Sequence, residues 1–381
     1  MTPSPPLPQG GGRTAPTTSE NEFIKTFPCQ GCGAKLSFAP GTHHLKCEYC
    51  GAENEFDAND ARIEELDFGT FLKALEGREE SMVAETVKCT KCGAGQTLPA
   101  NLFAATCAFC ATPIVSKGYA SRFLKPRSMI AFQVDRKRAQ EEFRKWVRGL
   151  WLAPNDLKRY AQSDAGLDGL YLPYWTYDCR TASDYQGERG DDYYTDEAYT
   201  TTDSKGDRVT QTRRQRNTRW SPASGHVERF HDDVLVMASK TLPAEVLGAS
   251  SRWNLKGLVP YQPEYVSGYR AEAYQIGLRE GFPIARLMID AQVRELVCRD
   301  IGGDHQRIHN VSTRYVDVKF KHVLLPVWIS AYRYRDKVYR FLVNGQTGEV
   351  SGASPKSWWK IFFLTVAMLI ILFILLVIFG N

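Results

Sequence analysis

Eight of the ten cysteines stand in four Cys-x-x-Cys pairs. The pairs form two units, and in each unit 14 residues separate the first pair from the second. The eight cysteines are Cys29, Cys32, Cys47, Cys50, Cys89, Cys92, Cys107 and Cys110. A two-residue gap lets one tight turn direct both thiolates at a single ion, and two such turns complete a tetrahedral sulfur set that selects zinc. The two units begin 60 residues apart, so they form an internal repeat. We therefore predict two structural zinc ions.

Short strand–turn–strand segments lie between the cysteine pairs. In the first unit, Leu36 and Phe38 lead through Pro40-Gly41 to Leu45. These units have too few apolar residues to fold alone, so metal binding has to contribute on the order of 10–16 kcal/mol per site. Disulfides are disfavoured in a reducing compartment, whereas an iron–sulfur or redox role stays open. We predict two zinc ribbons, at residues 26–53 and 86–118.

A long apolar run lies near the C-terminus. Residues 361–379 contain no charge, glycine or proline, and as a helix they would span about 28 Å, close to the thickness of a bilayer core. Trp358, Trp359, Lys356 and Lys360 form the expected membrane interface. A buried core helix is the alternative. We predict a single-pass anchor at 358–380 in the cytoplasmic (inner) membrane, with the N-terminal domains in the cytoplasm.

The composition restricts the class of protein. The chain has 381 residues, of which 43% are hydrophobic and 24% charged, which excludes wholesale disorder and a polytopic membrane protein. A formal charge of +5 does not indicate a protein that coats nucleic acid. We predict a disordered tail at 1–25 and an acidic linker with a short helix at 54–85. This linker would repel phosphate, which favours protein contacts for the ribbons.

The largest predicted unit covers residues 119–357. Residues 134–150 have the pattern of an amphipathic helix with Asp135 as N-cap, and strands are expected to begin near Pro173, Pro260 and Pro326. We expect polar hairpins over 185–220, a short buried strand at 234–237, and mostly helix over 269–299. The predicted core side chains of that last stretch are Tyr274, Ile276, Ile284, Leu287, Met288, Ala291 and Val297. The fold class is therefore α+β, with an antiparallel sheet, two tandem four-cysteine zinc ribbons and one C-terminal transmembrane helix.

No familiar catalytic motif is found. The sequence contains no Gly-Lys dipeptide, which a Walker A loop requires, and none of the common metalloprotease, hydrolase or dinucleotide motifs. The acid pairs Asp191-Asp192 and Asp232-Asp233 are expected to be solvated hairpin residues. Cys179 and Cys298 are expected to be small buried hydrophobes. We predict that the protein is not an enzyme.

Five arginines fall within twelve residues, beside Trp220. They are Arg208, Arg213, Arg214, Arg216 and Arg219. Alternation along a hairpin would place several guanidinium groups on one face, where nucleic-acid phosphate or anionic lipid could bind. A simple solvated hairpin is the competing interpretation.

Several segments resemble one bacterial family. They are the ribbons, LPYWTYD (172–178), TRWSPASGHV (218–227), the stretch from 266 that ends in RDIGGDH, and LPVWISAYRYRDKVYRFLVNGQTGEV (325–350). The chain resembles proteins labelled primosomal protein N′ (replication factor Y), superfamily II helicase, or TFIIB-type zinc-ribbon proteins. That resemblance implies zinc at the eight cysteines and an ATP-driven helicase. The phosphate loop of such a motor is missing here, and the chain is about half the length that a motor would need.

The resemblance also bears on partners. Related membrane-anchored zinc-ribbon proteins work beside membrane-stress and flotillin-like scaffolds, and the resemblance implies partners of that kind at the cytoplasmic membrane. Together with the anchor and the missing catalytic motifs, this predicts a non-enzymatic, membrane-tethered adapter in contact with the lipid bilayer. A membrane-associated nucleic-acid-binding protein is the alternative.

Overall fold

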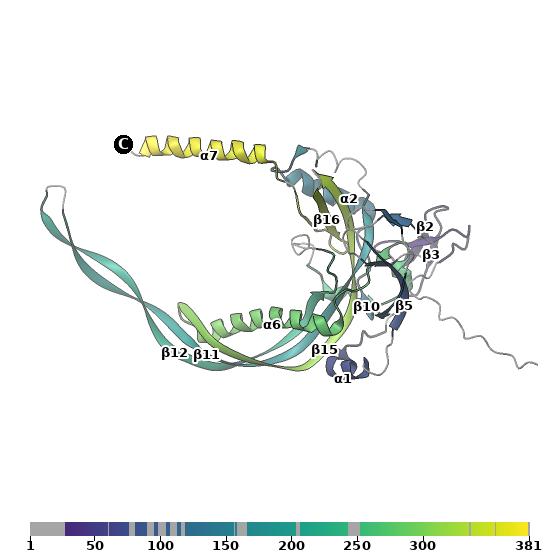
Figure 1. Cartoon of the computed structure of the whole chain (residues 1–381), viewed down its shortest axis with the longest axis horizontal. Coiled ribbons are helices and arrows are strands. Elements are labelled where there is room, and N and C mark those ends of the chain that lie inside the picture. The colour runs from purple at the N-terminus through teal and green to yellow at the C-terminus, as the bar shows by residue number, and fades with distance from the viewer. Residues whose placement is uncertain are drawn as a thin grey trace, which may run out of the picture.

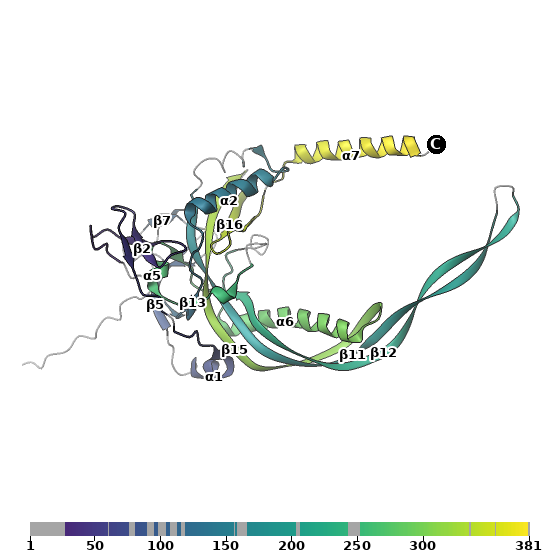
Figure 2. The same ribbon diagram turned by 180° about the vertical axis from the view of Figure 1, so that it is seen from behind.

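A computed structural model describes most of the chain. The described residues are 27–59, 61–75, 81–89, 95–97, 104–106, 113–115, 119–155, 157, 166–202, 206–242, 252–334, 337–354 and 356–379. Figure 1 shows a packed body from which two long elements leave on the same side: a curved β structure and the C-terminal helix. The view from behind in Figure 2 agrees. The tail predicted for 1–25 lies outside the described residues.

A small antiparallel sheet follows the first cysteine pair. It contains β1 (Leu36–Phe38), β2 (His44–Cys47) and β3 (Glu53–Glu55), in that order. Leu36 pairs with Cys47 and Phe38 with Leu45, which confirms the predicted strand–turn–strand unit. Gly33 and Gly51 each follow the second cysteine of a pair and have φ of +73° and +75°. This left-handed turn favours glycine, since it has no Cβ to clash.

The predicted second ribbon is described only in part. The strands in it and directly beside it are β5 (Ser81–Lys88), β6 (Gly95–Thr97), β7 (Ala104–Thr106), β8 (Pro113–Val115) and β9 (Tyr119–Leu124), of which β9 and most of β5 lie outside the predicted 86–118. β5 pairs antiparallel with both β6 and β9, and β7 pairs with β8. Cys92, Cys107 and Cys110 lie outside the described residues, so the second zinc site stays a prediction.

One large sheet dominates the molecule. Its long strands are β11 (Asp168–Thr202), β12 (Arg208–Met237) and β15 (His305–Tyr334). The shorter ones are β4 (Leu66–Asp67), β10 (Ser128–Met129), β13 (Val259–Pro260), β14 (Arg270–Ala271), β16 (Lys337–Asn344) and β17 (Val350–Gly352). Most neighbours are antiparallel, but β10 runs parallel to β15 and β14 to β11. The short strand predicted at 234–237 is wrong in extent, since these residues end the 30-residue β12.

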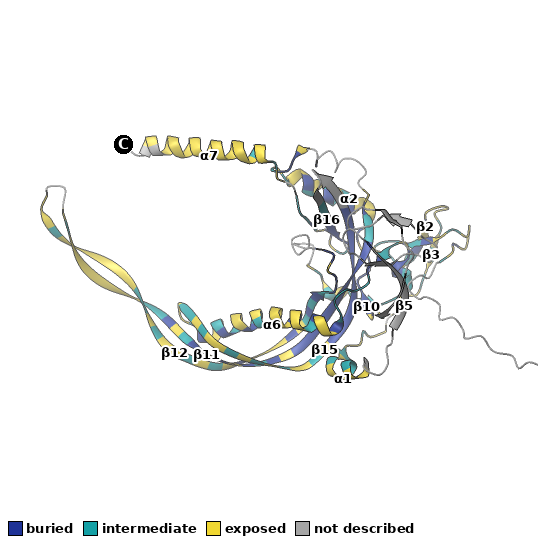
Figure 3. Cartoon of the chain, viewed as in Figure 1, coloured by how far each residue is buried: buried dark blue, intermediate teal, exposed yellow. Residues whose placement is uncertain are grey.

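The long strands form an arm, which we define as residues 179–231 of β11 and β12 with 305–318 of β15. β15 pairs with β11 out to Gly190. Beyond that point only β11 and β12 remain, and we call residues 191–202 and 208–219 the distal hairpin. Figure 3 shows burial giving way to exposure along this course. Both edges and both faces of the distal hairpin are therefore open to solvent.

The pairings among the three long strands shift register at the same level of the sheet, next to Asp178. The β11–β12 register shifts between Tyr177 and Cys179, and the β11–β15 register shifts between Asp178 and Arg180. The extra residues include Asp233 and Asp317, whose φ values are +50° and +53°. Bulges of this kind bend a strand and increase its twist. We call this region the elbow, residues 177–180, 231–234 and 316–321.

Helix α6 (Leu278–Ile301) covers one face of the arm's three-stranded part. Gly281 lets it approach closely, since a Cβ there would lie 2.4 Å from the Tyr177 hydroxyl oxygen. The predicted helix over 269–299 is wrong for its first turns, where the chain instead forms β14 and an extended segment. Val297 is buried as predicted, but Ile284, Leu287 and Met288 are exposed. Ala291 is exposed as well, so the predicted core of α6 is only partly correct.

The remaining helices surround the body. They are α1 (Phe68–Leu75), α2 (Arg136–Gly149), the 3-10 turn η3 (Leu255–Gly257), α5 (Pro263–Val266) and α7 (Trp358–Phe379). Asp135 Oδ1 accepts from the backbone N–H of Arg138 at 2.7 Å, which confirms the predicted N-cap of α2. The short helix predicted in the linker is α1, whose Phe68 and Phe71 rings contact Phe320. This element therefore packs on the chain itself.

Candidate metal centre and binding surfaces

Four cysteine sulfurs meet at the base of the first ribbon. Cys29 Sγ lies 3.6 Å from Cys50 Sγ, and Cys32 Sγ lies 3.6 Å from Cys47 Sγ. All four sulfurs lie within 4.8 Å of one another. Four thiolates bound tetrahedrally to zinc at 2.3 Å would be about 3.8 Å apart. This four-cysteine cluster could therefore bind a zinc ion with little rearrangement.

The turns around the cluster favour the thiolate form of Cys29 and Cys47, because their backbone N–H groups lower the pKa of these thiols. The backbone N–H groups of Cys32 and Gly31 lower the pKa of Cys29 to about 6. The N–H of Cys50 lies 3.5 Å from Cys47 Sγ and lowers the pKa of that thiol as well. At Cys32 the N–H of Ala34 acts in the same direction, but the neighbouring sulfurs and burial together raise its pKa to about 12. A dipositive ion would remove this repulsion, because thiolate is the form that binds metal.

The ribbon is packed firmly against the body. Phe38 N–H donates to Ser267 O at 2.9 Å, and the Ser267 hydroxyl donates to Leu36 O at 2.7 Å. The Phe38 and Tyr265 rings meet edge to face at 5.1 Å. Cys47, Leu36 and Phe38 belong to the same buried cluster as Trp328 in β15. The metal cluster and the body therefore share one hydrophobic core.

The predicted membrane-interface residues lie where α7 begins. Trp358 and Trp359 are exposed, and the Lys360 ammonium donates to Ala153 O at 2.7 Å and Trp151 O at 3.2 Å. Among the described residues, α7 is the one helix that is long and apolar enough to cross a membrane. None of its residues from Trp358 to Leu375 is buried. This exposure argues against a core helix. The helix could be a membrane anchor.

The structure places all five predicted arginines on the distal hairpin. Their register puts Arg208, Arg214 and Arg216 on one face and Arg213 and Arg219 on the other. Acidic residues lie opposite them: Arg213 forms a 3.1 Å ion pair with Glu197, and Arg216 a 3.5 Å ion pair with Asp192. The Arg214 guanidinium stacks on Tyr194 at 4.2 Å. Cross-strand acids therefore offset the charges of Arg213 and Arg216, which lowers the charge that an anionic ligand would meet.

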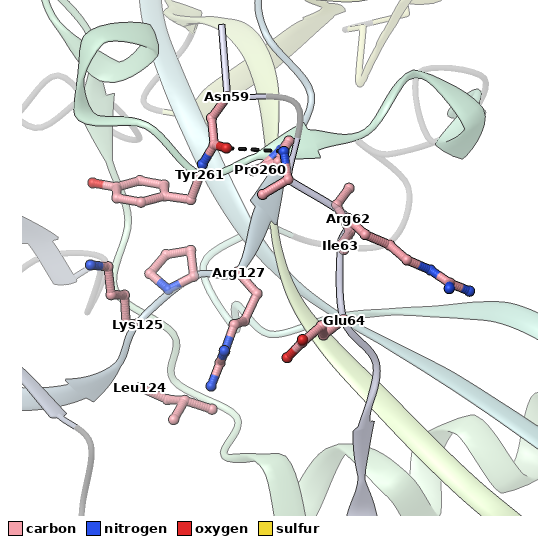
Figure 4. A pocket seen from close by; sticks show the side chains of 11 residues that line it. Asn59, Arg62, Ile63, Glu64, Leu124, Lys125, Arg127, Pro260 and Tyr261 are labelled. Carbon is pink, nitrogen blue, oxygen red and sulfur yellow. Dashed lines mark hydrogen bonds between the residues drawn. The ribbon is translucent and has the colours of Figure 1, made fainter.

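A pocket of about 430 Å³ opens beside the body's first linker. Asn59–Glu64, Leu124–Arg127 and Pro260–Tyr261 contribute to its wall, apart from residue 60, which is not described. Figure 4 shows Arg127 and Glu64 reaching into the same part of the pocket, with Arg62 directed away from it. The described lining contains no serine, cysteine or histidine. It therefore offers a mixed polar and apolar binding surface.

Sequence reasoning missed two buried acidic residues, Glu272 and Asp178. Glu272 is 3% exposed, accepts from the Thr241 hydroxyl at 2.6 Å and from Ser239 at 2.9 Å, and has its pKa raised by burial to about 8. Asp178 is 1% exposed at the elbow. No local motif marks either residue, because the partners of each come from distant segments. Cys179 is buried as predicted, whereas Cys298 is only half-buried.

Comparison with known proteins gives one distant relative. The chain is 26% identical over 356 residues to the uncharacterized protein YdjG of Bacillus subtilis strain 168, which covers 89% of this chain and 92% of that protein. No family model and no solved structure matches the chain. The similarity extends over nearly the whole length of both proteins. At this level of identity the similarity assigns no family.

Proposed function

We propose that this protein is a membrane-tethered adapter without enzymatic activity, in which α7 is the tether. The observation that carries the proposal is the contrast at residue 358: the preceding chain is packed, whereas the following helix is apolar on every side and exposed. A helix with those properties is stable when lipid surrounds it. Lys356 and Lys360 beside it support a cytoplasmic orientation of the body under the positive-inside rule.

The adapter part of the proposal rests on surfaces that suit proteins. The arm extends the β-sheet well beyond the body and leaves the backbone groups of its distal hairpin edges open, which is how strands recruit further strands or loops. With zinc bound, the first ribbon would stabilise the part of the body on which it packs. By resemblance, the partners are membrane proteins of the flotillin-like or membrane-stress kind. Two structural zinc ions, one in each ribbon, complete the proposal.

Membrane attachment is tested by fractionation of the full chain. We expect the protein in membranes after alkaline extraction. The double variant Leu369→Arg, Leu372→Arg should release it, since each arginine at a helix centre costs about 2.5–3.5 kcal/mol of insertion. The matched control Leu369→Ile, Leu372→Ile should stay bound. A wild-type chain found in the soluble fraction would contradict the tether.

Partner binding is tested by affinity purification from detergent-solubilised membranes. The register allows a clean truncation, because Asp192 faces Thr218 and residues 193–217 can be replaced by an Asn-Gly turn. We expect one or more membrane proteins to co-purify with the full chain and to be lost with the truncated arm. The Phe230→Ser variant, at an exposed site nearer the body, is the control for non-specific capture. Equal recovery of the partner proteins with the full chain and with the truncated variant would refute a role for the distal hairpin.

Nucleic-acid binding is the weaker candidate, because acidic residues and tyrosines face the arginines of the hairpin. It predicts an affinity for single-stranded DNA that falls steeply with salt. Arg213→Ala, Arg214→Ala and Arg216→Ala together should then abolish the binding. Binding of this kind in the purified full chain would replace the adapter proposal.

A further inference from the structure

The elbow gathers more carboxylates than it has cations to balance them. Glu65 and the elbow's Asp178, Asp232, Asp233 and Asp317 carry five negative charges and Arg180, Lys319 and Lys321 three positive ones, which leaves two negative charges. The Lys321 ammonium lies 2.7 Å from Asp233 Oδ1, 3.2 Å from Glu65 Oε1 and 3.7 Å from Asp178 Oδ2. The side chains of Lys321 and Asp178 are 8% and 2% exposed, so water does little to screen this pair.

Two carboxylate oxygens in the cluster are buried without a hydrogen bond, Asp178 Oδ2 and Asp233 Oδ1, and the second has the Lys321 ammonium at 2.7 Å. Asp178 Oδ1 accepts from the backbone N–H of Asp233 at 2.5 Å, but Oδ2 accepts none from the described residues. Its ion pair with Lys321 is long, at 3.7 Å. A buried carboxylate oxygen left in this way is costly unless a further cation or donor reaches it. Burial accordingly raises the pKa of Asp178 to about 6.

The geometry of three carboxylates fits a single ion. One oxygen from each of Asp178, Asp232 and Asp233 lies within 4.8 Å of the others. Oxygens that share a calcium ion at 2.3–2.6 Å lie at most about 5 Å apart. Asp232 is exposed and Asp178 buried, so an ion could enter from solvent on the Asp232 side. Carboxylate oxygen is the ligand type that hard divalent cations prefer.

We infer that the elbow is a binding site for a hard divalent cation of the calcium, magnesium or manganese class, held by Asp178, Asp232 and Asp233. The ion balances the two excess charges and gives Asp178 Oδ2 a partner. Because Asp178 belongs to β11 and the other two ligands to the β12 bulge, the ion joins the strands where they bend. It therefore fixes the direction in which the arm leaves the body. The sulfur ligands of the ribbon are soft and select zinc, so the two sites discriminate between metals.

The test uses Mn²⁺ as probe and the full chain in detergent micelles, with its zinc retained. Loss of the free Mn²⁺ signal in electron paramagnetic resonance gives the bound fraction. We expect saturable binding of one ion with a dissociation constant below about 1 mM. Asp232→Asn and Asp233→Asn should each weaken it at least about tenfold. Asparagine tolerates the left-handed backbone of Asp233, so these variants should fold.

Asp317→Asn is the matched control. Asp317 is exposed, has the same left-handed backbone in the β15 bulge, and is not among the three clustered ligands. We expect its Mn²⁺ affinity to equal that of the wild type. Absence of saturable binding, equal affinity in Asp232→Asn and wild type, or an equal loss in Asp317→Asn would each overturn the site.

Discussion

The first ribbon and the distal hairpin are both small β structures, yet the chain stabilises them in opposite ways. The ribbon directs Leu36, Phe38 and Cys47 into the core of the body and adds a four-cysteine cluster at its base. The distal hairpin has no buried face, and backbone pairing with cross-strand contacts holds its strands in register. A two-stranded ribbon without a hydrophobic face is marginal in isolation.

The first ribbon therefore contributes to the stability of the body, whereas the distal hairpin extends away from the body and contributes little to it. Perturbing the ribbon should affect the entire body, because the two share a core. Perturbing the distal hairpin should be felt locally. The four predictions below test that contrast.

Loss of the metal cluster should have the largest effect. Cys47→Ser removes a buried sulfur ligand, and a structural zinc site contributes on the order of 10 kcal/mol. We expect the variant to lose one zinc ion by elemental analysis and the body to melt at a much lower temperature in near-UV circular dichroism. Cys298→Ser, outside the cluster, should leave both unchanged. A body that melts normally without this zinc would show that the ribbon folds independently.

The seam between ribbon and body comes next. Phe38 is 2% exposed and packs on Tyr265, so Phe38→Ala should lower the free energy of unfolding by about 3–5 kcal/mol. Denaturant titration of the full chain in detergent measures this. Tyr49→Ala, in the same ribbon but 86% exposed, should change it by less than about 0.5 kcal/mol. Similar effects from both substitutions would argue against a shared core.

Glu272 should make the stability of the body depend on pH. Its folded pKa of about 8 lies above the ordinary value of 4.5, so the folded protein binds more protons than the unfolded chain between these values. Stability is therefore full below about pH 4.5 and falls as the pH rises towards 8, by roughly 3 kcal/mol between pH 5 and 8. Glu272→Gln should flatten this part of the profile, and Glu264→Gln should not.

The smallest effect is expected on the distal hairpin. Arg214→Ala removes a cation–π contact with Tyr194, for which about 0.5–1 kcal/mol is typical at exposed sites. We expect faster hydrogen exchange of the hairpin amides and an unchanged melting temperature of the body. A cycle with Tyr194→Ala isolates the pair. A fall in the melting temperature of the body would erase the contrast between the two regions.

Sequence alone predicted the parts that local chemistry determines. The Cys-x-x-Cys spacing, the turn at Pro40-Gly41 and the Asp135 N-cap each act within a few residues. The uninterrupted apolar run after Lys360 likewise predicted a helix of membrane-spanning length.

Features that depend on distant segments could not be predicted. Polar residues on both faces of the distal hairpin hid the length of β11 and β12, since neither face of that part points to a core. Apolar residues on two sides of α6 concealed which stripe is buried, and only contact with the arm selects Ala285 and Ile289 over Leu287. The elbow cluster needs bulges in two strand pairs to assemble.

The common exit side of the arm and α7 constrains how the molecule rests on a bilayer (Figures 1 and 2). If α7 spans a membrane, the charged arm stays outside the lipid, so α7 and the arm must then point in different directions. Headgroup phosphates could then accept hydrogen bonds from the Lys360 ammonium in place of the backbone carbonyls of Trp151 and Ala153. The arm would then lie along the membrane surface, where it would meet neighbours that are themselves confined to two dimensions.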